Sequence, residues 1–312
     1  MNFEASEDLR AFMSAVERLA AHRAIGLSGP AARFRYGSDL AQELEASGFL
    51  DCMSVDELGS LAAASMIIEL SRLPECVEVV AASLVAPQLP LQVPRPLALL
   101  WDDRRRPARF LPMARAVIAV RGEIVEFAEL RDGDAVEIVS SFAYPMGVLR
   151  EPDALEWQVL DRPDASALRT HWRIGIASEL VGCLGAGLDA VVDYVKERRQ
   201  FGRPLGSFQA IQHRLAECAT LIEGARWLTL KAADTASPID VAVAIGHAQQ
   251  ATAKVCHDLH QFMGAMGLTL EHPLHRWTYR ARLLRAELGG AEHHFSIAAD
   301  AAWGSPAGAH AR

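Results

Sequence analysis

The sequence predicts a mostly α-helical protein with a small β domain in its middle. Apolar residues recur at three- and four-residue spacing before about residue 90 and again after Asp164, as amphipathic helices require. Between Pro94 and Asp161 the pattern changes to short apolar or alternating runs separated by turn residues. The chain of 312 residues is long enough for two or three compact domains. We therefore predict an N-terminal helical domain over 1–90, a reduced β middle domain over 91–162 and a C-terminal helical domain over 163–312.

Three helices are expected before the β domain, at residues 7–23, 38–46 and 60–71. In the first of them Leu9, Phe12 and Val16 share one face. Four strands are expected in the β domain, at Leu97–Trp101, Ala114–Val120, Glu123–Leu130 and Ala135–Ser141. The dipeptides Arg121-Gly122 and Asp132-Gly133 between these runs are typical of hairpin turns.

A long apolar pattern predicts one continuous helix from Ile174 to Arg199. Gly182, Gly185 and Gly187 lie inside it. Their spacing is not GxGxxG and no strand precedes them, so they favour close packing against another helix over dinucleotide binding.

Composition and charge exclude several classes of function. The net charge of −8 argues against a protein that binds nucleic-acid phosphates through a basic face. No uninterrupted run of 18 apolar residues and no basic, apolar leader is found, so we expect a cytoplasmic protein without a membrane span. The five cysteines are scattered without a CxxC pair, which predicts reduced, buried thiols.

Two segments of the C-terminal region carry a resemblance to a known family. Residues 194–217 read YVKERRQFGRPLGSFQAIQHRLAE, with a Tyr, then RxxFG, then FQxxQxxLA. Residues 261–276 read QFMGAMGLTLEHPLHR and follow the pattern QxxGGxGxxxExPxxR except for one glycine. Both segments resemble the signatures of the acyl-CoA dehydrogenase family, and they occur in the same order. The resemblance is good from Ala167 to Gly290, loose in the N-terminal helices and poor in the β domain.

The resemblance implies an FAD-dependent enzyme with a C-terminal four-helix bundle through which subunits pair. In that family these segments contact the ADP half of an FAD that the neighbouring subunit holds. The cofactor-binding residues implied here are Arg198, Gln200, Phe201, Gln209, Gln261, Gly264 and Ala265. A guanidinium beside a turn can clamp a pyrophosphate with charge-assisted hydrogen bonds. The alternative is that Arg198 makes a surface salt bridge and Gln209 a contact between helices.

The sequence departs from the family pattern in the flavin-binding segment and in the catalytic base. No T-E-P-x-x-G-S-D-like segment occurs between Pro94 and Asp161. The position of the usual catalytic Glu falls on Leu288, and the position used by a minority of members falls on Trp172. Loss of a positioned base costs about 10²- to 10⁴-fold in rate. Glu287, one residue before Leu288, is the reserve candidate, and Glu179 is expected to be a helix-face or interface carboxylate.

These features resemble the smaller, base-lacking subunit of α2β2 heteromeric acyl-CoA dehydrogenases, including those that act on steroid side chains. The resemblance implies a larger homologue that carries the catalytic Glu, an acyl-CoA substrate, and an electron-transfer flavoprotein or similar acceptor. Two alternatives stay open: a self-sufficient homo-oligomeric dehydrogenase that uses Glu287, and a non-catalytic stabilising subunit.

Other clusters in the sequence have simpler interpretations. Cys256, His257, His260, His272 and His275 do not repeat at zinc-ligand spacing, so no metal site is expected. The sequence contains no G-x-S-x-G element of a serine hydrolase. His293-His294 is interpreted as helix surface, Arg104 to Arg106 as a solvated loop, and the tail after Gly304 as frayed.

Overall fold

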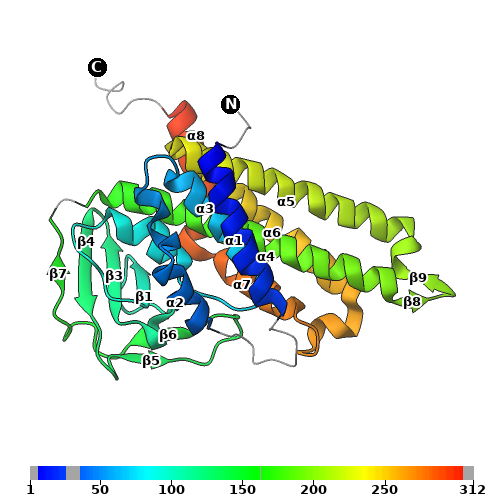
Figure 1. Ribbon diagram of the computed structural model, residues 1–312, viewed down its shortest axis with the longest axis horizontal. Coiled ribbons are helices and arrows are strands. Elements are labelled where there is room, and N and C mark those ends of the chain that lie inside the picture. The colour runs from blue at the N-terminus through cyan, green and yellow to red at the C-terminus, as the bar shows by residue number, and fades with distance from the viewer. Residues whose placement is uncertain (1–5, 26–35, 162, 305–312) are drawn as a thin grey trace, which may run out of the picture.

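The computed structural model describes residues 6–25, 36–161 and 163–304, and it confirms a mostly helical chain with a small β region. Figure 1 shows the strands of the β region gathered at one end of the molecule, the long C-terminal helices extending away from them, and one short hairpin at the other end. The N-terminal helices cover the place where these two parts meet. The expected frayed tail after Gly304 lies outside the described residues.

The N-terminal helices follow the predicted periodicity closely. They are α1 (Glu7–Ile25), α2 (Ser38–Ala46) and α3 (Gly59–Leu70). Short 3-10 and π turns follow at Phe49–Ser54, Ala81–Val85 and Ala86–Gln88. The apolar face of α3, with Met66 and Ile67 fully buried, packs against the long helix α4 (Ala165–Glu197).

The β region forms two small sheets. The first has the strand order β1 (Leu97–Trp101), β3 (Ala116–Arg121), β4 (Ile124–Glu129), β7 (Gln158–Val159), in which only β1 and β3 are parallel. The second has the order β2 (Ala108–Arg109), β6 (Met146–Leu149), β5 (Ala135–Glu137), all antiparallel. Both sheets lie beside the helical part of the molecule (Figure 1).

One of the two predicted hairpins is present and the other is not. Gly122, at a φ of +55°, closes the turn between β3 and β4. Gly133, at +95°, also lies in a turn, but β4 does not pair with β5, which joins the second sheet through β6. The prediction missed β2, β6 and β7 because two to four residues are too few to show an alternating pattern.

The C-terminal region is a bundle of long helices. It is built from α4, α5 (Gln209–Thr235), α6 (Pro238–Met263), α7 (Leu274–Leu284) and α8 (Gly290–Trp303). Asp164 caps the start of α4, and its side chain accepts hydrogen bonds from the backbone N–H groups of Ser166 at 2.8 Å and Ala167 at 3.1 Å. α4 is long and apolar enough to cross a membrane, but 78% of its most apolar window is buried inside the fold, which makes it a core helix.

The glycines of α4 serve close packing, as predicted. A Cβ added to Gly182 would lie 2.2 Å from the backbone oxygen of Ile68 in α3, so no larger residue fits without moving a helix. Gly187 is less crowded, since its nearest neighbour would be the end of the Leu259 side chain at 3.1 Å. All five cysteines are buried, as predicted, and none is joined to another by a disulfide bond.

A buried guanidinium fastens α7 to the N-terminal part of the chain. Arg280 donates hydrogen bonds to the backbone oxygens of Ser71 at 3.0 Å and Leu73 at 2.7 Å. Trp277 of the same helix donates to the backbone oxygen of Arg72 at 2.9 Å. These bonds satisfy carbonyls that follow the end of α3, and they fix the helix that leads into the residues around Glu287.

Candidate functional site

The predicted cofactor-binding residues lie at the far end of the bundle, away from the sheets. We call this set the bundle-end surface; it consists of Arg198, Gln200, Phe201, Gln209, Gln261, Gly264 and Ala265. All seven residues are exposed; they come from the C-cap of α4, the following hairpin, the start of α5, the end of α6 and the 3-10 helix Gly264–Leu268 after it. Because α4, α5 and α6 alternate in direction, these segments meet at one end (Figure 1).

A short hairpin between α4 and α5 presents part of the bundle-end surface. Strands β8 (Arg199–Gln200) and β9 (Arg203–Pro204) pair antiparallel, and the turn between them is Phe201-Gly202. Both turn residues have positive φ, +53° and +80°, as tight hairpin turns of this hand require. The Phe201 ring is 88% exposed, and its only described aromatic neighbour is Phe208, with ring centres 6.2 Å apart. An apolar ring held this far out of the core is suited to contact another molecule.

Ion pairs and ring contacts join the two signature segments. Arg214 of α5 forms an ion pair with the buried Asp258 of α6, and its guanidinium lies 4.9 Å from the ring centre of Phe262. The rings of Tyr194 and His272 lie 6.3 Å apart. Hydrogen bonds from Arg214 and Lys254 lower the pKa of Asp258, although its burial opposes them. Residues distant in sequence are therefore held as one surface.

Arg198 is the cation of this surface that is available for a ligand. It follows the last turn of α4 and is exposed, and in the described part of the chain its guanidinium has no ion-pair partner. Its neighbour Arg203 instead lies over the Phe208 ring at 3.9 Å. The predicted alternative, a surface salt bridge of Arg198, is not seen among the described residues.

A second candidate place is a cavity of about 510 Å³ between the β region, the N-terminal helices and the bundle. We call it the interdomain cavity. Its lining includes Val80, Leu97, Leu99, Trp101, Phe110 and Trp172, with the charged residues Glu78, Asp102, Arg106, Arg109, Glu179 and Glu287. Asp102 and Arg106 are exposed at its mouth, whereas most other lining residues are buried or half-buried. A volume of this size is within the range of small-molecule sites, about 300 to 1,000 Å³.

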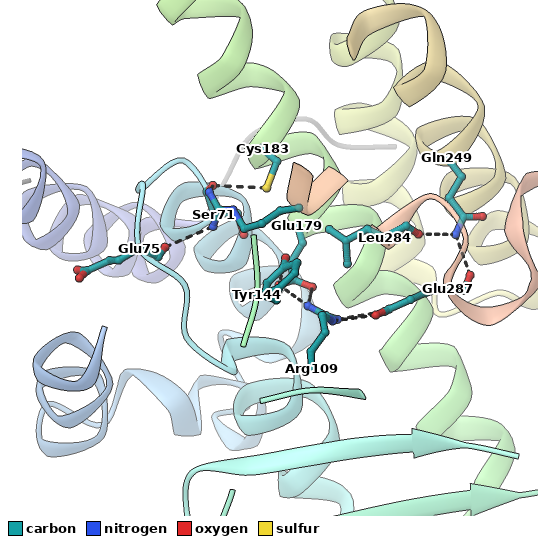
Figure 2. A network of polar contacts seen from close by, with 10 residues as sticks. Ser71, Glu75, Arg109, Tyr144, Glu179, Cys183, Gln249, Leu284 and Glu287 are labelled. Atoms are coloured by element: carbon teal, nitrogen blue, oxygen red, sulfur yellow. Dashed lines mark hydrogen bonds and ion pairs between the residues drawn. The ribbon is translucent and has the colours of Figure 1, made fainter. Parts of the chain in front are cut away.

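Arg109 bridges two carboxylates in this cavity, as Figure 2 shows. Its Nη1 lies 2.8 Å from Oε2 of Glu179, and its Nε lies 2.8 Å from Oε1 of Glu287. The Tyr144 hydroxyl donates to Glu179 at 3.2 Å, and its ring lies 4.7 Å below the Arg109 guanidinium. The side chains of Arg109 and Glu179 are only 10% and 8% exposed. The β region, α4 and the turn before α8 therefore meet in one buried polar network.

The backbone near Glu287 is held by a second buried side chain. Gln249 of α6 donates to the backbone oxygens of Leu284 and Glu287, each at 2.9 Å. Leu288, Gly289 and Gly290 then have φ of +55°, +99° and +77°. Three successive residues at positive φ make a sharp turn, and it directs the Glu287 side chain back toward Arg109 (Figure 2).

The electrostatics of the network keep Arg109 charged. Its burial alone would lower its pKa, but Glu179 and Glu287 together raise the pKa of Arg109 above its ordinary value. Burial raises the pKa of Glu287 while Arg109 opposes that change, and burial beside Glu179 raises the pKa of Tyr144. Glu78, also in the cavity, accepts a hydrogen bond from Tyr36 at 2.8 Å, and burial raises its pKa. The carboxylates in the depth of the cavity thus already have partners.

The two positions at which the family pattern would place the catalytic base both lie in this cavity. Trp172 and Leu288 line it, and Glu287 lies beside Leu288. The reserve candidate is therefore in the right cavity, but it is held by a guanidinium. The interpretation of Glu179 as a helix-face or interface carboxylate is wrong, because that residue is buried in the network. Sequence reasoning missed Arg109, Tyr144 and Gln249, whose partners lie 35 to 178 residues away along the chain.

Two further interpretations need correction. His294 is not helix surface: it is fully buried, while His293 is exposed and lines the cavity. Arg104 is not fully solvated, because it forms an ion pair with the buried Glu126 and lies over the Trp157 ring at 4.1 Å. The described residues contain no group of three or more His, Cys, Asp or Glu side chains arranged to hold a metal ion.

The architecture of a helical bundle joined to a small β region, with a cavity where they meet, is that of the acyl-CoA dehydrogenase fold. Solved structures show the same arrangement. A glutaryl-coenzyme A dehydrogenase in complex with glutaryl-CoA has a TM-score of 0.75 at 21% identity, with 98% of each chain covered. The ChsE4-ChsE5 complex from Mycobacterium tuberculosis has a TM-score of 0.75 at 21% identity and covers 98% of this chain and 100% of that chain. A steroid acyl-CoA dehydrogenase, Tcur3481-Tcur3483, has a TM-score of 0.74 at 21% identity and covers 95% of this chain and 98% of that chain.

Sequence comparison supports the acyl-CoA dehydrogenase family. Residues 165–302 match the family described as acyl-CoA dehydrogenase, C-terminal domain. The short-chain specific mitochondrial acyl-CoA dehydrogenase of Bos taurus is 39% identical over 125 residues, 38% of this chain and 30% of that protein. The glutaryl-CoA dehydrogenase of Desulfococcus multivorans is 38% identical over 113 residues, 34% of this chain and 29% of that protein. The chain therefore spans less than a third of the length of these curated relatives.

Proposed function

We propose that this chain is a subunit of an FAD-dependent acyl-CoA dehydrogenase and that its bundle-end surface completes the FAD site of a larger partner. The observation that carries the proposal is the contrast between two sets of charges. The guanidinium of Arg198 is exposed without a described ion-pair partner, while Glu287, the reserve candidate for the base, is engaged by Arg109. A surface with free donors suits a cofactor held by another subunit, and a cavity whose deep carboxylates are engaged does not suit proton abstraction.

The residues of the bundle-end surface fit the ADP half of FAD. Arg198 offers a fork of N–H donors, Gln209 and Gln261 offer side-chain amides, and Gln209 stands at the first turn of the long helix α5. Exposed N–H groups and the positive end of the helix dipole favour a diphosphate. Phe201 would supply a flat apolar contact. Gly264, at a φ of +57° with open space where a Cβ would be, lets a ligand approach the backbone.

The chain lacks residues that fit the flavin ring and the base. The family's flavin-ring segment is absent from its sequence, and the strands β5 and β7 of its β region have only three and two residues. Bound FAD accepts hydride from the β carbon of the acyl thioester, and a carboxylate must remove the α proton. Glu287 already accepts hydrogen bonds from the guanidinium of Arg109, so its carboxylate oxygens are engaged by that side chain and not free to meet a substrate. We therefore assign the base to the partner.

The partner we propose is a larger homologue that carries the catalytic Glu. The ChsE4-ChsE5 complex and the steroid acyl-CoA dehydrogenase Tcur3481-Tcur3483 are paired proteins by their names, and both share the fold of this chain. The substrate would be an acyl-CoA, with a steroid side chain as the finer hypothesis, and the electrons would pass to an electron-transfer flavoprotein or similar acceptor. A complex of two such pairs in the cytoplasm is the assembly we expect.

The test is to purify the full chain alone and after co-expression with the larger homologue. Flavin absorbance and native mass are measured for both preparations. We expect colour and an α2β2 mass only with the partner. Arg198→Ala should then lower flavin affinity about 10- to 100-fold, since hydrogen bonds to charged groups contribute about 1.5 to 3 kcal/mol.

A matched control is Arg131→Ala, which removes an exposed arginine from a turn of the β region. It should leave flavin content unchanged. Unchanged flavin in Arg198→Ala would favour the non-catalytic stabilising subunit. A yellow lone chain that oxidises an acyl-CoA, and that loses this activity in Glu287→Gln, would favour the self-sufficient dehydrogenase.

A further inference from the structure

His260 of α6 stands directly before the predicted cofactor residue Gln261 and is only partly exposed. Its backbone oxygen accepts a hydrogen bond from the backbone N–H of Gly264, which closes the last turn of α6. Its side-chain Nε2 lies 2.9 Å from the hydroxyl oxygen of the buried Thr278 in α7. The backbone of this one residue therefore meets the bundle-end surface, while its ring is fastened to another helix.

The same ring packs against the 3-10 helix Gly264–Leu268, which we call the bundle-end turn. A Cβ added to Gly267 would lie 3.3 Å from the Nδ1 atom of His260, and that atom is enclosed. The bundle-end turn begins with Gly264 and Ala265, two residues of the bundle-end surface. The His260 ring thus lies between this turn and α7, and a change in the ring is passed to the turn.

Hydrogen bonding around the ring determines which of its nitrogens carries the proton. The Thr278 hydroxyl donates its only proton to the backbone oxygen of Leu274 at 3.1 Å, so it accepts from His260. The neutral ring is therefore protonated on Nε2, and its Nδ1 faces the bundle-end turn without a proton. A second proton would be added at Nδ1, directly against Gly267.

The surroundings of His260 favour its neutral form. Burial, then Arg282 and His275, lower the pKa of His260, although the backbone of Gly267 favours the charged ring. The Tyr279 ring lies nearly parallel to that of His260, with ring centres 6.3 Å apart. The titratable or charged side chains near the ring are His275, Tyr279 and Arg282 of α7 and, on the preceding turn of α6, Cys256 and His257, while the bundle-end turn has none.

We propose that His260 is a positioning residue of the FAD site, whose neutral ring holds the bundle-end turn in the form that presents Gly264 and Ala265 to the cofactor. This inference rests on the proposed function, which assigns the ADP half of FAD to this surface. A protonated ring would set a second cation near Arg282 in partly buried surroundings, which is costly, so the turn would move away from the ring. Flavin should therefore bind most tightly at a pH at which His260 is neutral.

The test measures flavin affinity in the complex with the larger homologue, which is stripped of FAD and titrated with it at about pH 8. His260→Leu removes the hydrogen bond to Thr278, so the affinity should fall about 2- to 10-fold. Thr278→Val removes the acceptor and should give a similar loss. His260→Gln keeps an N–H donor and cannot become charged, so it should restore most of the affinity.

A pH series from about 8 to about 5.5 separates positioning from a merely structural role. The contribution of neutral His260 is present above about pH 6.5 and is lost as the pH falls. Across the series the affinity of the unchanged complex should fall about 3- to 10-fold more than that of His260→Gln, as a pKa difference of about 0.5 to 1 between free and flavin-bound complex implies. Comparing the two cancels the titration of all other groups. His257→Gln, at an exposed histidine one turn earlier, is the control and should behave like the unchanged complex.

Two results would overturn the inference and leave the proposed function intact. The first is weaker flavin binding in Arg198→Ala but not in His260→Leu or Thr278→Val. The second is parallel pH profiles for the unchanged complex and His260→Gln. Unchanged flavin binding in Arg198→Ala would instead contradict the proposed function, and the inference would fall with it. If His260→Leu fails to fold by circular dichroism, Thr278→Val and the pH series with His260→Gln decide the question.

Discussion

The bundle-end surface and the interdomain cavity both contain arginine and polar side chains, but they differ in whether the arginine is buried and paired with carboxylates. In the cavity, Arg109 is 10% exposed and its donors reach two carboxylates. At the bundle end, Arg198 is exposed and its guanidinium has no described ion-pair partner, while the Phe201 ring next to it is 88% exposed. The buried arginine of the cavity finds its carboxylate partners within the same chain, whereas the arginine of the bundle-end surface does not.

This difference indicates which of the two regions is built to bind another molecule. A buried guanidinium without its carboxylates would cost several kcal/mol, so the network of the cavity is part of the folded chain itself. Exposed donors cost nothing while water solvates them, and they are free to bind a diphosphate when a partner presents one. The two regions are joined by α4, which contributes Trp172 to the cavity lining and is followed directly by Arg198. Variants that separate stability from assembly can therefore test the comparison.

The largest effect is expected from Arg109→Met. The variant leaves Glu179 and Glu287 buried without their cation, so the free energy of unfolding should fall by about 3 to 5 kcal/mol. Urea or guanidinium unfolding at pH 7 measures it. Arg105→Met is the matched control, because Arg105 pairs with Asp153 on the surface and should cost about 1 kcal/mol or less. Equal losses in the two variants would contradict the buried network.

A triple variant sharpens this prediction. Replacing Arg109 by Met together with Glu179 and Glu287 by Leu removes both signs of charge, so most of the lost stability should return. If the triple variant is as unstable as Arg109→Met alone, the loss comes from packing of the arginine stem and not from unpaired carboxylates.

The next largest effect concerns the helix that joins the two regions. Gly182→Ala would place a methyl group 2.2 Å from the backbone oxygen of Ile68, so α3 and α4 must move apart. We expect a loss of about 1 to 3 kcal/mol in unfolding free energy. Gly187→Ala is the control, since the Leu259 side chain can turn away and alanine favours helix. A Gly182→Ala variant as stable as Gly187→Ala would show that the α3–α4 contact is loose.

The exposed region can be predicted from the sequence better than the buried one. The bundle-end surface is encoded by two contiguous segments, so residues near in sequence are also near in space, and its location follows once the helices alternate. The three N-terminal helices are predicted to within two residues, but α4 begins at Ala165, nine residues before the predicted start at Ile174. The arrangement of the β region is not predicted, since β5 pairs with β6, at residues 10 to 14 positions apart, and not with β4, the strand before it.

The buried network cannot be predicted because its members come from separate parts of the chain. Arg109 lies 70 residues from Glu179 and 178 residues from Glu287. Nothing in the residues around Arg109 distinguishes it from Arg104 or Arg105, which pair at the surface or near it. A histidine pair on a helix is usually solvated, but the burial of His294 depends on how α8 packs against α6, which the local sequence does not show.

A separate effect, which appears only as the pH falls, is expected from His294, the buried neighbour of His293. Burial first, then the nearby Arg173 and His293, lower the pKa of His294 to about 3. The unfolded chain takes up this proton near pH 6.5, before the folded chain does. The stability contributed by neutral His294 is therefore present above pH 6.5 and is lost as the pH falls toward 3, with a slope of up to about 1.4 kcal/mol per pH unit.

The variant His294→Leu removes this titration, so its unfolding free energy should depend less on pH between 6.5 and 4 than that of the unchanged chain. His293→Gln, at the exposed neighbour, is the control. Taking the difference between the chains cancels the opposite trend of Glu78 and Glu287, whose raised pKa values make stability fall as the pH rises. Parallel pH profiles for His294→Leu and the unchanged chain would mean that His294 becomes protonated in the folded state.

The smallest effect on stability should come from the bundle-end surface. In the double variant Arg198→Ala, Phe201→Ala both side chains are exposed, so the unfolding free energy of the lone chain should change by no more than about 0.5 kcal/mol. Loss of the positive-φ Phe201 side chain changes little, because alanine adopts the same turn with similar difficulty. The same variant should weaken flavin retention in the complex more than Arg198→Ala alone. A loss of more than about 1 kcal/mol in the lone chain would mean that these residues serve folding, and the contrast between the two regions would then disappear.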